Sequence, residues 1–258
     1  MKSKGIIYIF FLLIAQIGVL KGDDTGDILD QCSAALNIPS EAFSIERFNG
    51  GVSNRVYSLS TKSGEKFAAK IFTKRSLDDV YRIEQTVSAL RSMGLQIPET
   101  VTITLFHNNL PLHISRFQEG PHVTDHDLPR VAKLMAELHI KGSSIIPPPE
   151  KYKGEEHYRN LFKRCEDWAY TEELKKIYEG LDLSYLAEIP RGTIHGDFSY
   201  TNLINAENGR LTLIDFDHIC TSYLLTDLVR CHMFYGFDDE GRLQEGKVKK
   251  PEWFVSAS

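Results

Sequence analysis

Two short apolar segments in the last third of the chain lead directly into polar residues, and their spacing constrains the fold more than any other feature of the sequence. Residues 192–195 precede Asp197, and Asn202 follows five positions later. Residues 211–214 lead into Asp215, 13 positions after Asn202. Apolar runs of this length are typical of buried strands. The pattern therefore predicts two strands that carry Asp197, Asn202 and Asp215 to one place.

These three residues are of the types that phosphoryl transfer requires. One carboxylate orients an attacking hydroxyl and accepts its proton, and further oxygen ligands hold Mg²⁺ on the phosphates. Because Mg²⁺ keeps several waters and takes few protein ligands, Asn202 with Asp215 is a sufficient set. Taken alone, the first segment is explained equally well by a turn around Asp197, and the second by a helix cap at Asp215. The two segments in this order and spacing favour the chemical interpretation.

The composition is that of a folded protein with one large domain or two coupled lobes. The chain has 258 residues, of which 42% are hydrophobic and 25% charged, enough to bury a sizeable core. These values exclude a disordered tail, a fibrous repeat, a multi-span membrane protein and a disulfide-stapled miniprotein. The net charge of −5 gives no basic footprint for nucleic acid, so we expect no nucleic-acid partner.

The first part of the chain predicts an antiparallel β-meander. Residues 43–49 alternate apolar and polar side chains, as a half-exposed strand does. Ser76 is a good N-cap for a helix whose apolar residues recur at helical spacing. The predicted elements are a helix over 27–36, strands over 43–49, 56–59 and 66–72, a helix over 77–93, and strands over 101–105 and 112–117 joined by a turn at 107–109.

The second part is predicted to be mainly helical. Residues 119–121, Glu-Gly-Pro, interrupt the pattern. We place the lobe boundary there, with a nucleotide-binding N-lobe over 23–118 and a catalytic, acceptor-binding C-lobe over 119–258. The predicted elements are helices over 128–139 and within 155–187, and short strands at 192–195 and 211–214.

The two polar motifs resemble those of the aminoglycoside phosphotransferase and choline kinase family. Residues 195–202 have the pattern His-Gly-Asp-x-x-x-x-Asn, and residues 214–217 are Ile-Asp-Phe-Asp. The resemblance implies a two-lobed, protein-kinase-like α+β fold, with a small antiparallel β lobe holding one helix and a larger, mainly helical lobe. It implies ATP and Mg²⁺ as cofactors, Asp197 as the catalytic base, and Asn202 and Asp215 as metal ligands.

A glycine-rich turn between the first two strands is a further feature of this family. Residues 49–57 are Asn-Gly-Gly-Val-Ser-Asn-Arg-Val-Tyr, a form similar to that of homoserine-kinase-like and choline-kinase-like members. Glycines allow a close backbone approach, and successive N–H groups bind anionic oxygens. A Gly-Gly pair alone is typical of an ordinary hairpin turn. The resemblance implies that the residues covering the nucleotide phosphates are Gly50, Gly51, Val52, Ser53 and Asn54.

The family also pairs a strand lysine with a helix glutamate. Lys70 lies inside the apolar run 66–72, where an unpaired charge is costly, and Glu84 lies near the apolar face of the predicted helix. Solvent-facing side chains are the ordinary alternative for both. The resemblance implies that Glu84 fixes Lys70 and that Lys70 holds the α- and β-phosphates. It further implies that backbone groups at Ser115 and Phe117, in the hinge, contact adenine.

Four other residues are expected to support the site. His139 is expected to be structural, and His195 to organise the catalytic loop while Asp197 acts as the base. Asp217 assists either the metal or the loop. Asp227 resembles the Asp of the family's Asp-Leu-Ala element, which anchors the large lobe.

The predicted activity is transfer of the γ-phosphate of ATP to a hydroxyl of a small molecule, such as an amino alcohol, an amino sugar or a homoserine-like compound. The choice between ATP and GTP stays open.

Only 43 residues follow Asp215, whereas family members usually carry a longer helical tail that builds the acceptor pocket. The acceptor site is therefore expected to be reduced, completed by a partner, or missing through truncation. The alternative is a catalytically inactive nucleotide-binding or interaction module; a protein kinase is disfavoured because no Ala-Pro-Glu-like stretch follows Asp215.

Residues 1–22 are set apart from the fold. Lys2 and Lys4 precede an apolar run over 6–20, the layout of a secretory signal. About 15 residues are short for a membrane span, which needs roughly 20, so an export signal, a marginal anchor and a non-native extension are all open. Because ATP is abundant in the cytoplasm, we expect a cytoplasmic catalytic domain, with a membrane tether through 6–20 or export by a signal peptide as alternatives.

The four cysteines lie far apart and show no Cys-x-x-Cys spacing. They are Cys32, Cys165, Cys220 and Cys231. This favours free, partly buried thiols in a reducing compartment. Two disulfides or a zinc site are the alternatives.

Overall fold

The computed structural model describes residues 25–48, 54–149, 172, 175–176, 179–180 and 188–235. Contacts divide the chain into two compact units. Of the described residues, unit 1 contains 25–48, 54–80, 100–117 and those from 172 to 188, and unit 2 contains 81–99, 118–149 and 189–235. Each unit has its own hydrophobic core, and each is described by itself.

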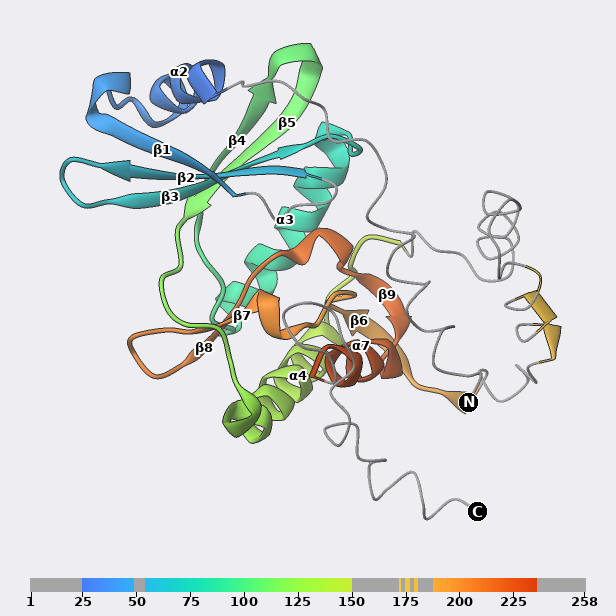
Figure 1. Cartoon of the computed structure of the whole chain (residues 1–258). Coiled ribbons are helices and arrows are strands. Elements are labelled where there is room, and N and C mark those ends of the chain that lie inside the picture. The colour runs from blue at the N-terminus through green and yellow to red at the C-terminus, as the bar shows by residue number, and fades with distance from the viewer. Residues whose placement is uncertain are drawn as a thin grey trace. The chain divides into compact units, whose positions relative to one another are not determined.

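Unit 1 is built on a five-stranded antiparallel sheet with the order β1-β2-β3-β5-β4 (Figure 1). Its elements are α2 (Thr25–Leu36), β1 (Phe43–Phe48), β2 (Asn54–Thr61), β3 (Lys66–Phe72), β4 (Thr100–Phe106) and β5 (Leu110–Arg116). The predicted meander is confirmed. The second strand is longer than the predicted 56–59 because its polar ends continue the pairing with β1 and β3.

The core of unit 1 lies between α2 and one face of the sheet. Ile28 and Cys32 of α2 pack in one cluster with alternate residues of β3, including Ala69 and Ile71. Because successive strand residues point to opposite faces, Lys70 lies on the face of the sheet away from this cluster. The strand pattern thus explains how a lysine sits inside an apolar run without being buried in the core.

Helix α3 (Leu77–Ser92) begins at the predicted cap. The Ser76 hydroxyl accepts the N–H of Asp79 at 3.1 Å, and the Asp79 carboxylate accepts the N–H of Ser76 at 3.2 Å. This reciprocal pair satisfies N–H groups that have no partner within the helix. Farther along, Val87 and Leu90 belong to the core of unit 2.

The described part of unit 2 contains two α-helices and two small antiparallel sheets in addition to most of α3. The elements are α4 (Leu128–Gly142), β6 (Arg191–Ile194), β7 (Leu203–Asn205), β8 (Leu211–Leu213), β9 (Cys220–Tyr223) and α7 (Leu225–Tyr235). Strand β6 pairs with β9, and β7 pairs with β8. The predicted strands near 192–195 and 211–214 are confirmed. Strands β7 and β9 were not predicted, because neither is a short β-like run that leads into Asp197 or Asp215, as 192–195 and 211–214 do.

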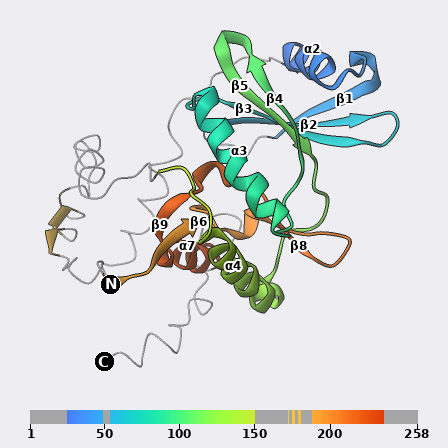
Figure 2. The same cartoon turned by 180° about the vertical axis from the view of Figure 1, so that it is seen from behind.

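Helix α4 fixes the strand that leads to the candidate catalytic loop (Figure 2). Its buried face includes Leu134 and Leu138, and the helix runs one turn beyond the predicted 128–139. At its end Gly142 accepts a 2.7 Å hydrogen bond from the Thr193 hydroxyl of β6. A Cβ at Gly142 would lie 2.6 Å from the Thr193 Cβ, so the close packing of α4 on β6 depends on glycine.

Several predictions concern residues that the structure does not describe. Residues 1–22 and nearly all of the predicted helical region 155–187 lie outside the described residues, as does Cys165. The lobe boundary at 118/119 stays a prediction. Across 25–48, 54–149 and 188–235, no helix combines the length and the apolar character needed to cross a membrane.

The three described cysteines are free and buried: Cys32, Cys220 and Cys231. Burial raises the pKa of the Cys32 thiol to about 12. Burial raises the pKa of Cys231 to about 11, and the Asp227 carboxylate adds to this effect. The predicted free thiols are confirmed for these residues, and the raised pKa values of Cys32 and Cys231 make those two thiols poor nucleophiles.

Asp127 is expected to stabilise unit 2 only while it is charged. Its carboxylate accepts the Thr124 N–H at 2.9 Å, the Asn205 amide at 3.1 Å and the Arg130 guanidinium at 2.6 Å. The backbone hydrogen bond from Thr124 is the largest cause that lowers the pKa of Asp127 below its ordinary 3.8. A carboxylate with a lowered folded pKa contributes stability above its unfolded pKa and loses it as the pH falls through the folded pKa.

We therefore expect Asp127→Asn to lower the free energy of unfolding by about 1 kcal/mol at pH 7. The difference from wild type should shrink progressively below pH 3.8, the unshifted value. Urea denaturation of both proteins between pH 7 and pH 3 measures it. A difference that does not change with pH would contradict the assigned ionic role.

Candidate active site

The loop after β6 presents Asp197 through a sharp turn at Gly196. Gly196 has a φ of +80°, which favours glycine. A Cβ at this position would collide with the carbonyl oxygen of His218. The loop therefore runs against the backbone of the second motif, and glycine is required for this approach.

His195 ties the loop to the end of β8. The buried ring donates from Nε2 to the carbonyl oxygen of Ile214 at 3.0 Å. Because a carbonyl can only accept, Nε2 carries the proton and Nδ1 accepts the N–H of Asp197 at 3.3 Å. The rings of Phe198 and Phe216 pack edge-on against the imidazole. These contacts support the predicted organising role of His195.

The carboxylate of Asp197 is held by both of its oxygens. Oδ1 accepts a hydrogen bond from Arg230 Nη1 at 3.0 Å, and Oδ2 accepts one from Asn202 Nδ2 at 3.1 Å. The Asn202 amide also donates to the Asp197 carbonyl at 2.9 Å. The side chain is 26% exposed, so it is oriented and still open to a reactant.

Asn202 is buried beside the strand end that carries Asp215. Its carbonyl oxygen accepts the N–H of Ile214 at 3.0 Å. Its amide nitrogen is bound to Asp197, and because the amide is planar, its Oδ1 oxygen is turned away from Asp197. The structure thus brings the backbone around all three predicted residues, Asp197, Asn202 and Asp215, into one hydrogen-bonded group.

Asp215 adopts a backbone conformation that is uncommon for a residue with a side chain. Its φ and ψ are 62° and 63°, in the left-handed region, which costs roughly 1 kcal/mol or more for a non-glycine residue. The exposed carboxylate stands directly before the 3₁₀ helix Phe216–His218. Strain of this kind is concentrated at functional sites, which supports a role for Asp215 beyond packing.

Asn202 and Asp215 carry oxygen donors of a type that could hold Mg²⁺. The Asn202 Oδ1 and the Asp215 carboxylate are hard oxygen ligands, of the kind that Mg²⁺ takes in small number. Among the described residues, no group of three or more His, Cys, Asp or Glu side chains could hold a metal. Mg²⁺ bound by few protein ligands usually keeps several waters. Asp217, two residues after Asp215, is buried in the 3₁₀ helix Phe216–His218, and whether it assists the metal or the loop stays a prediction.

Helix α7 anchors the loop after β6, which carries Asp197. The Asp227 carboxylate accepts the N–H groups of His195 and Gly196, both at 2.8 Å, and pairs with His139 Nε2 at 3.0 Å. Its side chain is fully buried. These bonds support the anchoring role expected for Asp227 and the structural role expected for His139.

Arg230 is a site residue that the sequence did not indicate. It lies one helical turn after Asp227 on α7 and bonds the Asp197 carboxylate. The available signal was the Asp-x-x-Arg spacing at 227–230, because residues three apart lie on the same side of a helix. That signal was not usable without the helix, since α7 itself was not predicted.

His218 is a neutral neighbour of these charges at pH 7. Burial lowers its pKa below the ordinary 6.5, and the charge of Arg230 acts in the same direction. The carboxylates of Asp197, Asp217 and Asp215 oppose this effect, in that order. The lowered pKa thus favours an uncharged His218 imidazole within electrostatic range of the Asp197 carboxylate.

The predicted nucleotide-binding residues of unit 1 lie on three strands or next to them. Lys70 lies on β3, with its ammonium 5.5 Å from the centre of the Phe72 ring. Asn54 begins β2 and Ser115 lies on β5. Phe117 follows β5 and stacks on Phe48 with a ring-centre distance of 6.1 Å. Gly50, Gly51, Val52 and Ser53 lie outside the described residues.

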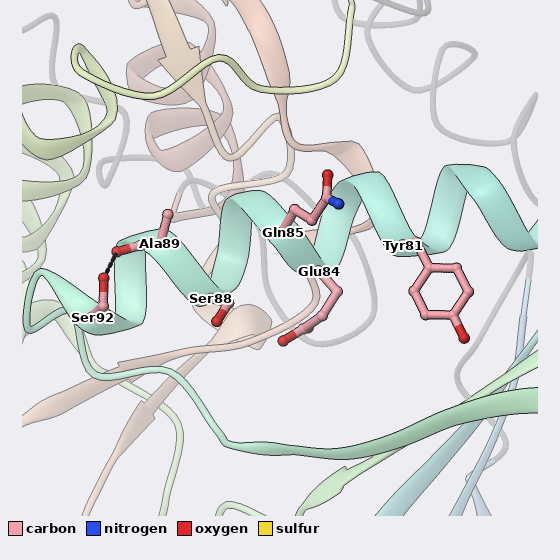
Figure 3. A pocket seen from close by; sticks show the side chains of 6 residues that line it. All are labelled: Tyr81, Glu84, Gln85, Ser88, Ala89 and Ser92. Atoms are coloured by element: carbon pink, nitrogen blue, oxygen red, sulfur yellow. Dashed lines mark hydrogen bonds between the residues drawn. The ribbon is translucent and has the colours of Figure 1, made fainter.

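Glu84 lies in unit 2, in an open hollow of about 440 Å³ along α3 (Figure 3). The residues that line it are Tyr81, Glu84, Gln85, Ser88, Ala89 and Ser92. The Glu84 carboxylate accepts a 3.4 Å hydrogen bond from Arg91, which also donates to the Pro98 carbonyl at 2.9 Å. Lys70 and Glu84 belong to different compact units, so their pairing stays a prediction.

Comparison with known proteins gives one consistent result. Residues 44–254 match the Phosphotransferase enzyme family. A homoserine kinase of Gluconobacter oxydans is 26% identical over 208 residues, covering 74% of this chain and 65% of that protein. A homoserine kinase of Methylobacillus flagellatus is 21% identical over 221 residues, covering 81% and 64%. The chain thus spans slightly less than two thirds of the length of these relatives.

Solved structures show the same fold. The choline kinase LicA from Streptococcus pneumoniae has a TM-score of 0.64 at 18% identity, covering 85% of this chain and 78% of that chain. The GDP and kanamycin complex of APH(2")-IIia has a TM-score of 0.61 at 19% identity, covering 82% and 78%. The predicted kinase-like α+β fold is therefore confirmed. With a match that extends over most of its length, the chain belongs to the phosphotransferase enzyme family.

Proposed function

We propose that this protein transfers the γ-phosphoryl group of ATP, in the presence of Mg²⁺, to a hydroxyl of a small molecule. The observation that carries the proposal is the Asp197 carboxylate, held on one oxygen by Asn202 at 3.1 Å and on the other by Arg230 at 3.0 Å. A carboxylate fixed in this way can orient a hydroxyl and accept its proton. The acceptor is an amino alcohol, an amino sugar or a homoserine-like compound, in keeping with the choline kinase, kanamycin complex and homoserine kinases to which the chain is similar.

The other residues would bind and orient the nucleotide. Asn202 and Asp215 would supply oxygen ligands to Mg²⁺, which neutralises charge on the transferring phosphates when it is bound. Lys70, fixed by Glu84, would hold the α- and β-phosphates. The 50–54 turn would cover the phosphates, and the backbone at Ser115 and Phe117 would contact adenine. Nucleotide binding is thus assigned to the N-lobe, 23–118, and catalysis to the C-lobe, 119–258.

A transfer assay tests the proposal directly. The full chain is incubated with Mg²⁺ and γ-labelled ATP or GTP, together with choline, ethanolamine, kanamycin or L-homoserine. We expect label to appear in at least one acceptor, with ADP or GDP released in equal amount. Nucleotide binding by thermal shift without any transfer would contradict the proposal and favour an inactive nucleotide-binding module.

We also propose that the catalytic domain works in the cytoplasm, where ATP is supplied, and that residues 6–20 tether it if they act as an anchor. Fractionating cells that express the chain with its N-terminus intact tests this location. Recovery of a processed, exported form would contradict it.

A further inference from the structure

Arg230 places a permanent positive charge at the catalytic carboxylate. Its Nη1 lies 3.0 Å from Asp197 Oδ1, and its side chain is 37% exposed. Helix α7, which carries Arg230, is held against the loop that carries Asp197, because Asp227, one turn earlier on α7, is buried and bonds the His195 N–H of that loop. Arg230 is therefore a positioned group and not a freely moving surface side chain.

An acceptor hydroxyl that binds at Asp197 Oδ1 also comes close to Arg230. The hydroxyl must lie about 2.8 Å from a carboxylate oxygen to pass on its proton. Added to the 3.0 Å bond between Arg230 and Asp197 Oδ1, this distance brings a hydroxyl at Oδ1 within about 6 Å of the guanidinium. A group two or three carbons from the hydroxyl is then within reach of Arg230.

The guanidinium retains donors for a second partner. Arginine has five N–H donors in a planar fork, and within the part of the chain that the structure describes one of them is engaged, by Asp197. A planar fork of this kind binds carboxylate and phosphate oxygens in pairs. It repels ammonium groups, which are the charges of a polycationic amino sugar.

We propose that Arg230 binds an anionic group of the acceptor, so that the chain phosphorylates a hydroxyl compound that carries a carboxylate or similar anion two or three carbons from the hydroxyl. This inference rests on the proposed function and narrows its acceptor to an anionic class. Arg230 is thus a specificity residue as well as a positioning residue for Asp197.

The anion at Arg230 could instead be the transferring phosphoryl group, and a matched pair of acceptors separates the two sources. L-homoserine carries a carboxylate, and L-homoserine amide carries a neutral amide in its place. The ratio of kcat/KM for the acid to kcat/KM for the amide is measured for wild type, Arg230→Gln, Arg230→Lys and the control Arg130→Gln. A variant that loses only the positioning of Asp197 or the binding of the phosphoryl group has lower kcat/KM for both acceptors by the same factor, so the ratio does not change. Arg130 is a suitable control because it pairs with a different aspartate, Asp127.

We expect wild type to prefer the acid at least about tenfold, the effect of one charge-assisted hydrogen bond. In Arg230→Gln the ratio should fall to about 1, mainly through a higher KM for the acid, while Arg230→Lys should give an intermediate ratio. Arg130→Gln should keep the wild-type ratio. Melting temperatures with and without Mg·ATP show whether each variant is folded.

Two results would overturn the inference while the proposed function stands. One is a wild-type preference for the amide or for kanamycin over the acid. The other is an acid-to-amide ratio that Arg230→Gln leaves unchanged, which would assign the arginine to the phosphoryl group or to Asp197 alone. Failure of wild type to phosphorylate any acceptor would instead contradict the proposed function, and this inference with it.

Discussion

Replacing Asp197 by asparagine is expected to lower the turnover of phosphoryl transfer by about 10²–10⁴-fold, the usual contribution of a general base. The amide retains one oxygen for Arg230 or Asn202 but cannot accept the proton of the acceptor hydroxyl. The affinity for Mg·ATP should change little, because the role proposed for Asp197 concerns the acceptor and not the nucleotide. Single-turnover transfer and a thermal-shift titration with Mg·ATP measure the two effects separately.

Asp127→Asn provides the matched control for this variant. It makes the same chemical change in the same compact unit, at a carboxylate bound to Thr124 and Arg130. We expect it to keep turnover close to that of wild type. Near-normal turnover in Asp197→Asn would show that the assigned role is wrong, and equal losses in both variants would indicate a general loss of structure.

Replacing Asp227 by alanine is expected to lower the free energy of unfolding by about 3–5 kcal/mol and to abolish transfer. The variant leaves the N–H groups of His195 and Gly196 buried without their acceptor, at about 1–3 kcal/mol each. His139 also loses its partner. Urea denaturation gives the stability, and the transfer assay gives the activity at a temperature where the variant is folded.

Asp227→Asn separates the anchoring role from a simple volume effect. Asparagine fills nearly the same space but has one oxygen, so it can accept one of the two backbone N–H groups and presents an NH₂ to the other. We expect a loss of stability about half that of the alanine variant and a clear loss of turnover. If asparagine were neutral for both quantities, the two charge-assisted bonds would not be holding the loop.

The N-terminal sheet was predictable because its strands are long enough to show a pattern. Residues 66–72 were assigned to a strand that the structure reproduces as β3, Lys66–Phe72. Ser76 was predicted as a cap from its residue type, and in the structure its side chain and that of Asp79 bond each other's backbone N–H. Such features depend on neighbours in the chain, and the sequence contains those neighbours.

Helix α7 and the short strands β7 and β9 were not predicted from the sequence. Strands β7 and β9 pair with β8 and β6, and this pairing is set by tertiary contacts and not by a local sequence pattern. With α7 missed, the alignment of Asp227 and Arg230 on one side of a helix could not be seen. The arginine at Asp197 was therefore outside what the residue pattern could indicate.

The candidate reacting groups could already be predicted from the order of amino acids. An aspartate, an asparagine five positions later and a second aspartate 13 positions beyond it form a chemical set that depends only on residue type and spacing. How that set is held depended on three-dimensional packing, because the bonds from Arg230, from Asn202 and from the buried Asp227 join segments up to 33 residues apart. Local chemistry is encoded along the chain, whereas the orientation of a carboxylate is decided by the groups that folding places around it.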